Sequence, residues 1–154
     1  MLSIKEQQVY SLCLIEASKS KLLYQHGCIA TVGGKIIERG INNHNNRNKL
    51  CVENICSCHA EIDVLYKIYY RFHKRGKGSK IDRIFRKMTL YITRAKNDGS
   101  YNSAPCIDCL NTIKKLDIKK IIFYQDERIT VINPKIYFND HMSHCQKYIN
   151  SIIG

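Results

Sequence analysis

The stretch PCIDCLNTIKKLDIKKIIFYQDERITVI, residues 105–132, decides the fold, because it predicts one helix and two strands in immediate succession. The helix follows from apolar residues at steps of three and four, namely Cys109, Leu110, Ile113 and Leu116. Residues 120–124 and 129–132 are short apolar runs typical of strands. Residues 126–128 are too few for a parallel crossover, so these two strands are predicted to be antiparallel.

The N-terminal part of the chain predicts a helix followed by a hairpin. A helix over 3–21 begins with Ser3 and Glu6 in the spacing of a capping box. Two strands over 28–39 are joined by a two-residue Gly-Gly turn at positions 33–34. The first half of the chain therefore supplies one helix and two antiparallel strands.

The middle of the chain alternates between helix and strand. Residues 41–58 are polar and predict a loop, and a second helix runs from His59 to a basic linker that begins at Gly76. Residues 89–93 predict a third strand, Pro105 suits the first turn of the third helix, and the chain from about Asn139 predicts a closing helix. This order favours an α/β fold: a three-layer α/β/α sandwich with a mixed five-stranded sheet. Residues 1–154 are expected to form a single domain.

Composition and charge limit the classes of function that this chain could have. The 154 residues are 44% hydrophobic, so a packed core is expected, and no apolar run is long enough to predict a membrane span. The first residues resemble no signal peptide, which favours a cytoplasmic or nuclear location with its eight cysteines reduced. The net charge of +12 suggests a nucleic-acid partner. The alternative is compositional: an AT-rich coding sequence would produce this bias, with 17 Lys against 8 Arg, without selection for binding.

Two short motifs carry the residues suited to a metal: His59-Ala60-Glu61 and Pro105-Cys106-Ile107-Asp108-Cys109. Cys106 and Cys109 are three residues apart at a helix start, so both sulfurs face one point and the helix dipole favours their thiolates. His59 begins another helix and is the predicted third ligand. Three protein ligands leave a fourth position for water, as in catalytic zinc sites.

Glu61 is a carboxylate that this ligand set does not need. Zinc lowers the pKa of a bound water toward neutral, and Glu61, in the same turn as His59, can take the water proton and pass it to a leaving amine. The combination predicts hydrolytic deamination at C4 of cytosine or C6 of adenine. The alternative, two packed cysteines and an ordinary histidine, must explain four suitable residues by coincidence.

The order H-x-E followed by P-C-x-x-C is the known signature of zinc nucleobase deaminases. With the 33–34 turn and Gly40-Ile41-Asn42, it makes the chain resemble the cytidine/deoxycytidylate deaminase superfamily from the hairpin to about Tyr124. The resemblance implies that Asn42 contacts the substrate sugar and that the backbone of Ala60 helps to hold the base. It also implies a homo-oligomer, because relatives commonly assemble.

Other details refine the resemblance. The antiparallel fifth strand is more similar to the free-cytidine branch than to the deoxycytidylate and tRNA-adenosine branches. The long loop before Pro105 and the His-Met-Ser-His segment at 141–144 resemble deaminase-like proteins of large DNA viruses, in which case the location would be the host cytoplasm.

Three further features leave alternatives open. A second, structural zinc could be bound by Cys51, Cys56 and Cys58 with His44 or His26, although the spacing matches no standard finger, and the other interpretation is reduced thiols. The nine basic residues between 67 and 87, against Asp82 alone, suggest either a phosphate-binding patch or a solvated surface. The loop over 95–104 is either a substrate lid, with Tyr101 stacking on a base, or a surface insertion.

The leading interpretation is a zinc-dependent deaminase that converts cytidine, deoxycytidine or dCMP to the uracil form and releases ammonia. A second interpretation is deamination of cytosine or adenine in single-stranded DNA or RNA. A third, of another class, is a catalytically silent zinc-binding module. The presence of Glu61 argues against the third, because a silent module needs no carboxylate there.

Overall fold

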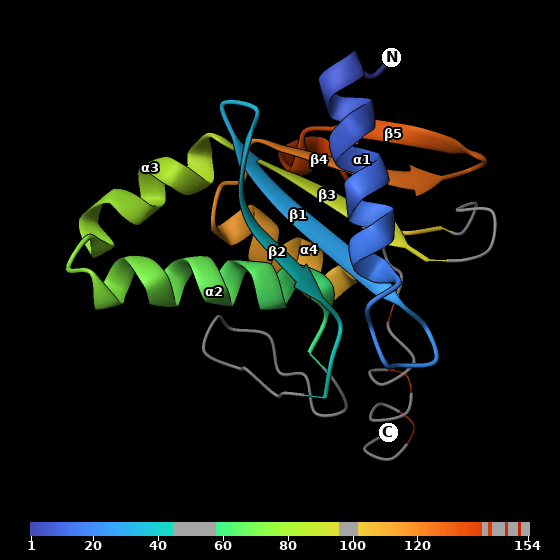
Figure 1. Ribbon diagram of the computed structural model, residues 1–154, viewed down its shortest axis with the longest axis horizontal. Helices are drawn as coiled ribbons and strands as arrows, with labels where there is room; N and C mark the ends of the chain where they lie inside the picture. Colours follow the sequence, from blue (N-terminus) through green and yellow to red (C-terminus); the bar gives the residue numbers. More distant parts are fainter. Residues whose placement is uncertain (45–57, 96–101, 140–141, 143–146, 148–150, 152–154) are drawn as a thin grey trace.

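Five strands form one mixed sheet in the order β2-β1-β3-β4-β5, and helices cover both of its faces (Figure 1). The computed structural model describes residues 1–44, 58–95 and 102–139 and the single residues 142, 147 and 151. The strands are β1 (His26–Val32), β2 (Lys35–Ile41), β3 (Met88–Arg94), β4 (Lys120–Gln125) and β5 (Arg128–Ile132). β1 is antiparallel to β2 and β3, β3 is parallel to β4, and β5 is antiparallel to β4.

The helices form the outer layers of a three-layer sandwich. α1 (Ile4–Ala17) covers one face, and α2 (Ala60–Lys74) and α4 (Ile107–Lys115) cover the other (Figure 1). The larger core cluster lies between the sheet and α2, α4 and the short α3 (Ile81–Arg86), and a smaller one lies under α1. The predicted fold class and the antiparallel fifth strand are confirmed. Among the described residues, no helix has both the length and the apolar character needed to span a membrane.

α1 packs almost backbone to backbone on β1. Its capping box forms as predicted, with Ser3 Oγ accepting from Glu6 N at 3.1 Å and Glu6 Oε1 accepting from Ser3 N at 3.0 Å. A Cβ on Gly27 would lie 2.6 Å from the backbone nitrogen of Ala17 and 2.8 Å from the carbonyl oxygen of Cys13. Only glycine permits this approach. The helix ends at Ala17, four residues before the predicted end.

Two predictions about the helices are wrong. The basic linker after α2 is not a linker: a 3₁₀ turn, η2 (Gly78–Lys80), leads into α3, whose Ile81 and Phe85 are buried in the core. The many basic residues of this segment hide its helical spacing of apolar side chains. Pro105 precedes the third predicted helix instead of lying in its first turn, since Cys106 is the N-cap of α4. The predicted closing helix lies largely outside the described residues.

The sheet has one edge where the helices of the candidate site begin. β2, β3 and β4 run in one direction because β1 is antiparallel to both β2 and β3 and because β4 is parallel to β3. Their carboxyl ends therefore share an edge, and the chain leaves β2 toward α2 and β3 toward α4. In open α/β sheets, ligands bind at the carboxyl ends of the strands.

Candidate active site

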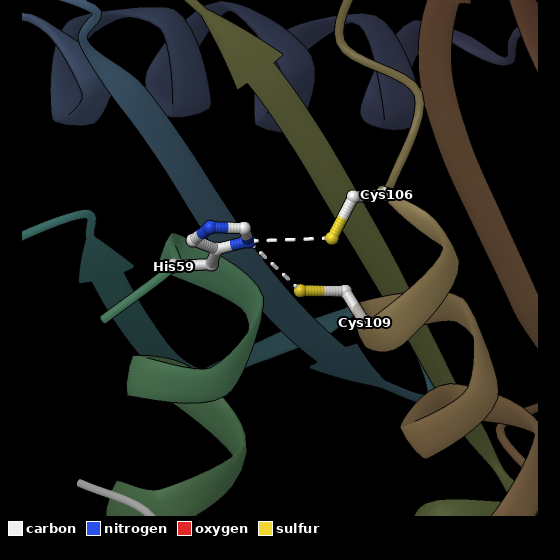
Figure 2. Close-up of side chains that lie close together, drawn as sticks. All are labelled: His59, Cys106 and Cys109. Carbon is white, nitrogen blue, oxygen red and sulfur yellow. Dashed lines mark hydrogen bonds between the residues drawn. The ribbon is translucent and has the colours of Figure 1, made fainter. Parts of the chain in front are cut away.

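The N-termini of two helices bring three metal-ligand side chains together (Figure 2). His59 is the N-cap of α2, Cys106 is the N-cap of α4, and Cys109 lies in the first turn of α4. His59 Nδ1 is 3.2 Å from Cys109 Sγ and 3.5 Å from Cys106 Sγ. The three donor atoms all lie within 4.8 Å of one another. The structure therefore unites the three residues that the spacing predicts as ligands.

The geometry and chemistry of this donor set fit zinc. Tetrahedral zinc with bonds of about 2.0–2.1 Å to nitrogen and 2.3 Å to sulfur separates the two donors by about 3.6 Å. The observed separations of 3.2 and 3.5 Å are close to that value, so a zinc ion needs only a small outward shift of the side chains. One imidazole and two thiolates are ligands that zinc prefers, and three protein ligands leave one position open.

The two sulfurs behave as a coupled pair. A hydrogen bond from Cys109, together with His59, lowers the pKa of the Cys106 thiol to about 4, whereas the same hydrogen bond and burial raise the pKa of Cys109. Of the two thiols, Cys106 is therefore the one that loses its proton more readily. Burial would lower the pKa of His59, but its hydrogen bond with Cys106 and the charge of Cys106 outweigh burial and raise it. Zinc binding displaces protons from these groups, because its ligands are the thiolates and the neutral imidazole.

A short bridge to the sheet positions His59. The backbone nitrogen of Asn43 donates to the carbonyl of Cys58 at 3.0 Å, and the nitrogen of Cys58 donates to the carbonyl of Asn43 at 2.7 Å. These bonds attach the residue before His59 to the residues that follow β2. His59 therefore enters α2 from the edge of the sheet.

Ser103 positions the cysteine pair. Its hydroxyl donates to the carbonyl of Ile92 at 2.7 Å and accepts from the backbone nitrogen of Tyr124 at 2.9 Å, while its own nitrogen donates to the carbonyl of Tyr124 at 2.8 Å. Ser103, buried at 1% exposure, thus links β3 to β4 just before Pro105. Sequence reasoning missed Ser103, because a serine in a polar loop carries no signal of such contacts.

Asp63 connects the first turn of α2 to β2 through a hydrogen bond. The Oδ2 atom of Asp63 accepts from the backbone nitrogen of Ile41 at 3.2 Å and from Lys67 Nζ at 2.9 Å. A Cβ on Gly40 would lie 2.8 Å from that oxygen and 2.7 Å from Cγ2 of Val64, so this close approach requires glycine. Asp63 was also missed, because its partner on β2 lies 22 residues earlier in the sequence.

Glu61 lies buried beside the metal ligands, at 5% exposure. Burial is the main reason why its pKa is raised above the ordinary carboxyl value, with His59 acting in the opposite direction. After burial and Cys13, the charge of Glu61 also raises the pKa of the Cys28 thiol on β1, an inner strand of the sheet. A carboxylate in such surroundings exchanges a proton near neutral pH more readily than an exposed one.

Both polar atoms of the Asn42 side-chain amide form hydrogen bonds with backbone atoms just before and at the start of β1. Its Oδ1 accepts from the nitrogen of His26 at 2.9 Å, and its Nδ2 donates to the carbonyl of Tyr24 at 2.6 Å. The residue is buried at 7% exposure. The sugar contact implied for Asn42 stays a prediction, and the structure adds a supporting role for the segment that leads into β1.

Asn42→Ala tests which of these two roles dominates. Loss of two backbone contacts is expected to destabilise the fold by about 2 kcal/mol and lower the melting temperature by about 4–8 °C. A residue acting only on the sugar would instead raise KM and leave the melting temperature unchanged. Thermal unfolding of the variant and of the exposed control Asn111→Ala distinguishes the two outcomes.

The remaining predicted site residues are placed as follows. Ala60 is fully buried as the first residue of α2, and its proposed backbone contact with the base stays a prediction. Cys58 is buried and packs against Cys106 and Cys109. His44 is exposed, and Cys51, Cys56 and Tyr101 lie outside the described residues. Over the described ranges one metal-ligand group is found, so the second zinc stays a prediction.

Comparison with known proteins identifies the family. Residues 3–125 match the family model described as the cytidine and deoxycytidylate deaminase zinc-binding region, and the chain belongs to this family. With its His59, Cys106 and Cys109 donors, the protein is a zinc-binding member of the cytidine/deoxycytidylate deaminases. No curated protein matches the sequence itself.

Two solved structures are similar in fold. Cytidine deaminase from Burkholderia pseudomallei has a TM-score of 0.57 at 12% identity, over 92% of this chain and 100% of that chain. The dCMP deaminase from the cyanophage S-TIM5, in complex with dCMP and dUMP, has a TM-score of 0.52 at 20% identity, over 79% of this chain and 81% of that chain. The second comes from a virus, which agrees in part with the viral resemblance of the sequence.

Proposed function

We propose that this zinc-dependent hydrolytic deaminase acts on a cytosine nucleoside or nucleotide and produces the uracil form with release of ammonia. One observation carries the proposal: the buried carboxyl group of Glu61, with a raised pKa, lies beside the three donors His59, Cys106 and Cys109. A zinc-binding module without catalysis has no use for that carboxyl group, because the donor set is complete without it.

The residues of the chain account for the proton movements. Zinc held by the three donors would supply an activated water in its open position. Glu61 takes one proton from the water and gives it to ring N3 as the water oxygen bonds to C4. It then takes the second proton from the new C4 hydroxyl and gives it to the amino group, which leaves as ammonia while C4 becomes a carbonyl carbon. Burial raises the pKa of Glu61, which makes its carboxylate a stronger proton acceptor than an exposed one. In this proposal, the backbone of Ala60 and the side chain of Asn42 would hold the base and the sugar.

A substrate panel tests the proposal. Zinc-loaded protein is incubated with cytidine, deoxycytidine, their monophosphates, adenosine analogues and single-stranded oligonucleotides, and ammonia release is measured. We expect release from at least one of the free cytosine compounds and a uracil product. Release from adenosine analogues alone, or from oligonucleotides alone, would contradict the proposed substrate class.

A second candidate substrate is a base within single-stranded DNA or RNA, and one surface favours it. Of the nine basic residues between 67 and 87, Lys67 and Arg71 are paired with Asp63 and Glu38. The other seven are exposed at the end of α2 and around α3: Lys74, Arg75, Lys77, Lys80, Arg83, Arg86 and Lys87. α2 is 15 residues long, so these side chains begin about 22 Å from the zinc end of the helix.

Binding to oligonucleotides of different length tests this candidate. A strand that spans about 22 Å must be several nucleotides long, so a short oligonucleotide cannot occupy the basic surface and the zinc end together. We expect affinity to rise with length and to fall steeply with salt if the surface serves substrate binding. Absence of binding at low salt would exclude the candidate.

Homo-oligomer formation and a cytoplasmic or host-cytoplasmic location are further proposals from the family resemblance.

A further inference from the structure

The carbonyl oxygen of Pro105, directly before the zinc ligand Cys106, is bound by a side chain from a later segment of the chain. Nδ2 of Asn139 donates to this oxygen at 3.0 Å. The two residues are 34 positions apart, and the contact is partly buried. The hydrogen bonds of α4 begin one residue later, where the carbonyl of Cys106 accepts from the nitrogen of Leu110 at 2.9 Å. The helix therefore leaves the carbonyl of Pro105 to another donor.

The segment that carries this donor, residues 133–139, is here called the α4 strap, because it runs along α4 in the opposite direction. Near the start of the strap, Nζ of Lys135 lies 2.9 Å from Oδ1 of Asp117, just after the end of α4. At the end of the strap, Asn139 binds Pro105, just before the start of α4. The strap therefore connects the two ends of the helix that carries both cysteine ligands.

Tyr137 attaches the strap to the sheet between these two points. The centroid of its ring lies 5.3 Å from that of Phe123, and its hydroxyl donates to Oε1 of Gln125 at 3.2 Å. Both partners belong to β4, and Tyr137 packs against the larger core cluster. Because these contacts already order the strap, the hydrogen bond from Asn139 costs little additional conformational entropy.

The φ and ψ angles of Pro105 orient the backbone that enters Cys106. The proline ring fixes φ at about −65°. The hydrogen bond from Asn139 to the carbonyl restrains ψ, because the peptide group is planar and turns as one unit. The Cys106 side chain, which extends from this peptide group, turns its sulfur toward His59 (Figure 2). Asn139 therefore acts on the direction of this ligand through the backbone.

We propose that Asn139 is a positioning residue of the zinc site: its side-chain amide holds the peptide group between Pro105 and Cys106, so that the Cys106 sulfur faces the metal position. Hydrogen bonds around a metal site orient its ligands and thereby tune its affinity. A bond that only attached the strap would have no effect on the metal. The inference concerns metal binding, so it does not depend on which compound is deaminated.

Asn139→Ala tests the proposal against a matched control on the same strap. We expect the zinc affinity, measured by competition with a chelator, to fall about 10-fold, the lower end of the usual range for supporting contacts, because Asn139 acts through the backbone. In cobalt-loaded protein, the absorption bands that depend on the geometry of the thiolate ligands should shift. Asn139→Gln keeps an amide donor and should recover part of both effects. The control is Asn133→Ala, which should leave both quantities at the wild-type level, because the Asn133 side chain accepts from the nitrogen of Lys135 at 3.0 Å, a bond within the strap.

Thermal unfolding of the zinc-saturated variants completes the comparison. Unchanged zinc affinity and an unchanged cobalt spectrum in Asn139→Ala would overturn the proposal, and a lower melting temperature with those wild-type metal properties would assign Asn139 to strap attachment alone. An equal loss of zinc affinity in Asn133→Ala would also overturn it, because the effect would then belong to the whole strap. None of these measurements needs turnover. A protein that deaminates no cytosine compound would therefore refute the proposed function, while the metal measurements would still decide the role of Asn139.

Discussion

Glu61→Gln is expected to reduce the deamination rate by about 10²- to 10⁴-fold, the usual contribution of a general acid–base group, while zinc remains bound. The amide has nearly the shape of the carboxyl group but can neither accept the water proton nor return it to the amine. Glu61 is not one of the three metal donors, so the zinc content should stay at the wild-type level. Ammonia release and metal analysis of the same preparation measure the two quantities.

Two comparisons make this result specific. Glu61→Ala should lose activity to a similar extent and should in addition lose stability, because it leaves space in a buried position. Asp108→Asn changes a nearby, partly exposed carboxyl group on α4 and should leave a much larger share of the activity. A Glu61→Gln variant that deaminates as fast as the wild type would refute the proposed proton transfer.

Cys109→Ala is expected to abolish both zinc binding at this site and deamination. Removing only a hydrogen-bond partner of a metal ligand typically reduces metal affinity by about 10- to 100-fold, and loss of a direct ligand should exceed this. Cys109 is fully buried, and among the described residues its ligand group contains two other donors, His59 and Cys106, which are too few to hold zinc tightly. Metal analysis after dialysis and ammonia release with added zinc measure the effect.

Chelation and a second cysteine variant complete this test. A chelator should inactivate the wild type, and added zinc should restore its activity but not that of Cys109→Ala. Cys13→Ala removes an equally buried thiol from α1, on the other face of the sheet, and should keep both zinc and activity. Full zinc occupancy in Cys109→Ala would show that the metal binds elsewhere.

Local motifs predicted much of the fold and the donor set. The capping box, the Gly-Gly turn and the short β4–β5 connection depend on residues close in sequence, and all three formed as expected. The turn between β4 and β5 has positive φ angles at Asp126 and Glu127; aspartate is among the residues that favour such angles, whereas glutamate is not. The prediction failed at α3, where basic residues hide a two-turn helix whose packing partners come from elsewhere in the chain.

By itself, the sequence determined the class of chemistry. The spacing within Pro105–Cys109 places two sulfurs on one helical turn, and His59-Ala60-Glu61 places a donor and an acid on another, because these relations depend only on local helix geometry. Tertiary structure alone decided what surrounds that chemistry. Ser103 joins β3 to β4, and Asp63 joins α2 to β2. Such contacts depend on strand order and register, which the packing of the whole sheet determines.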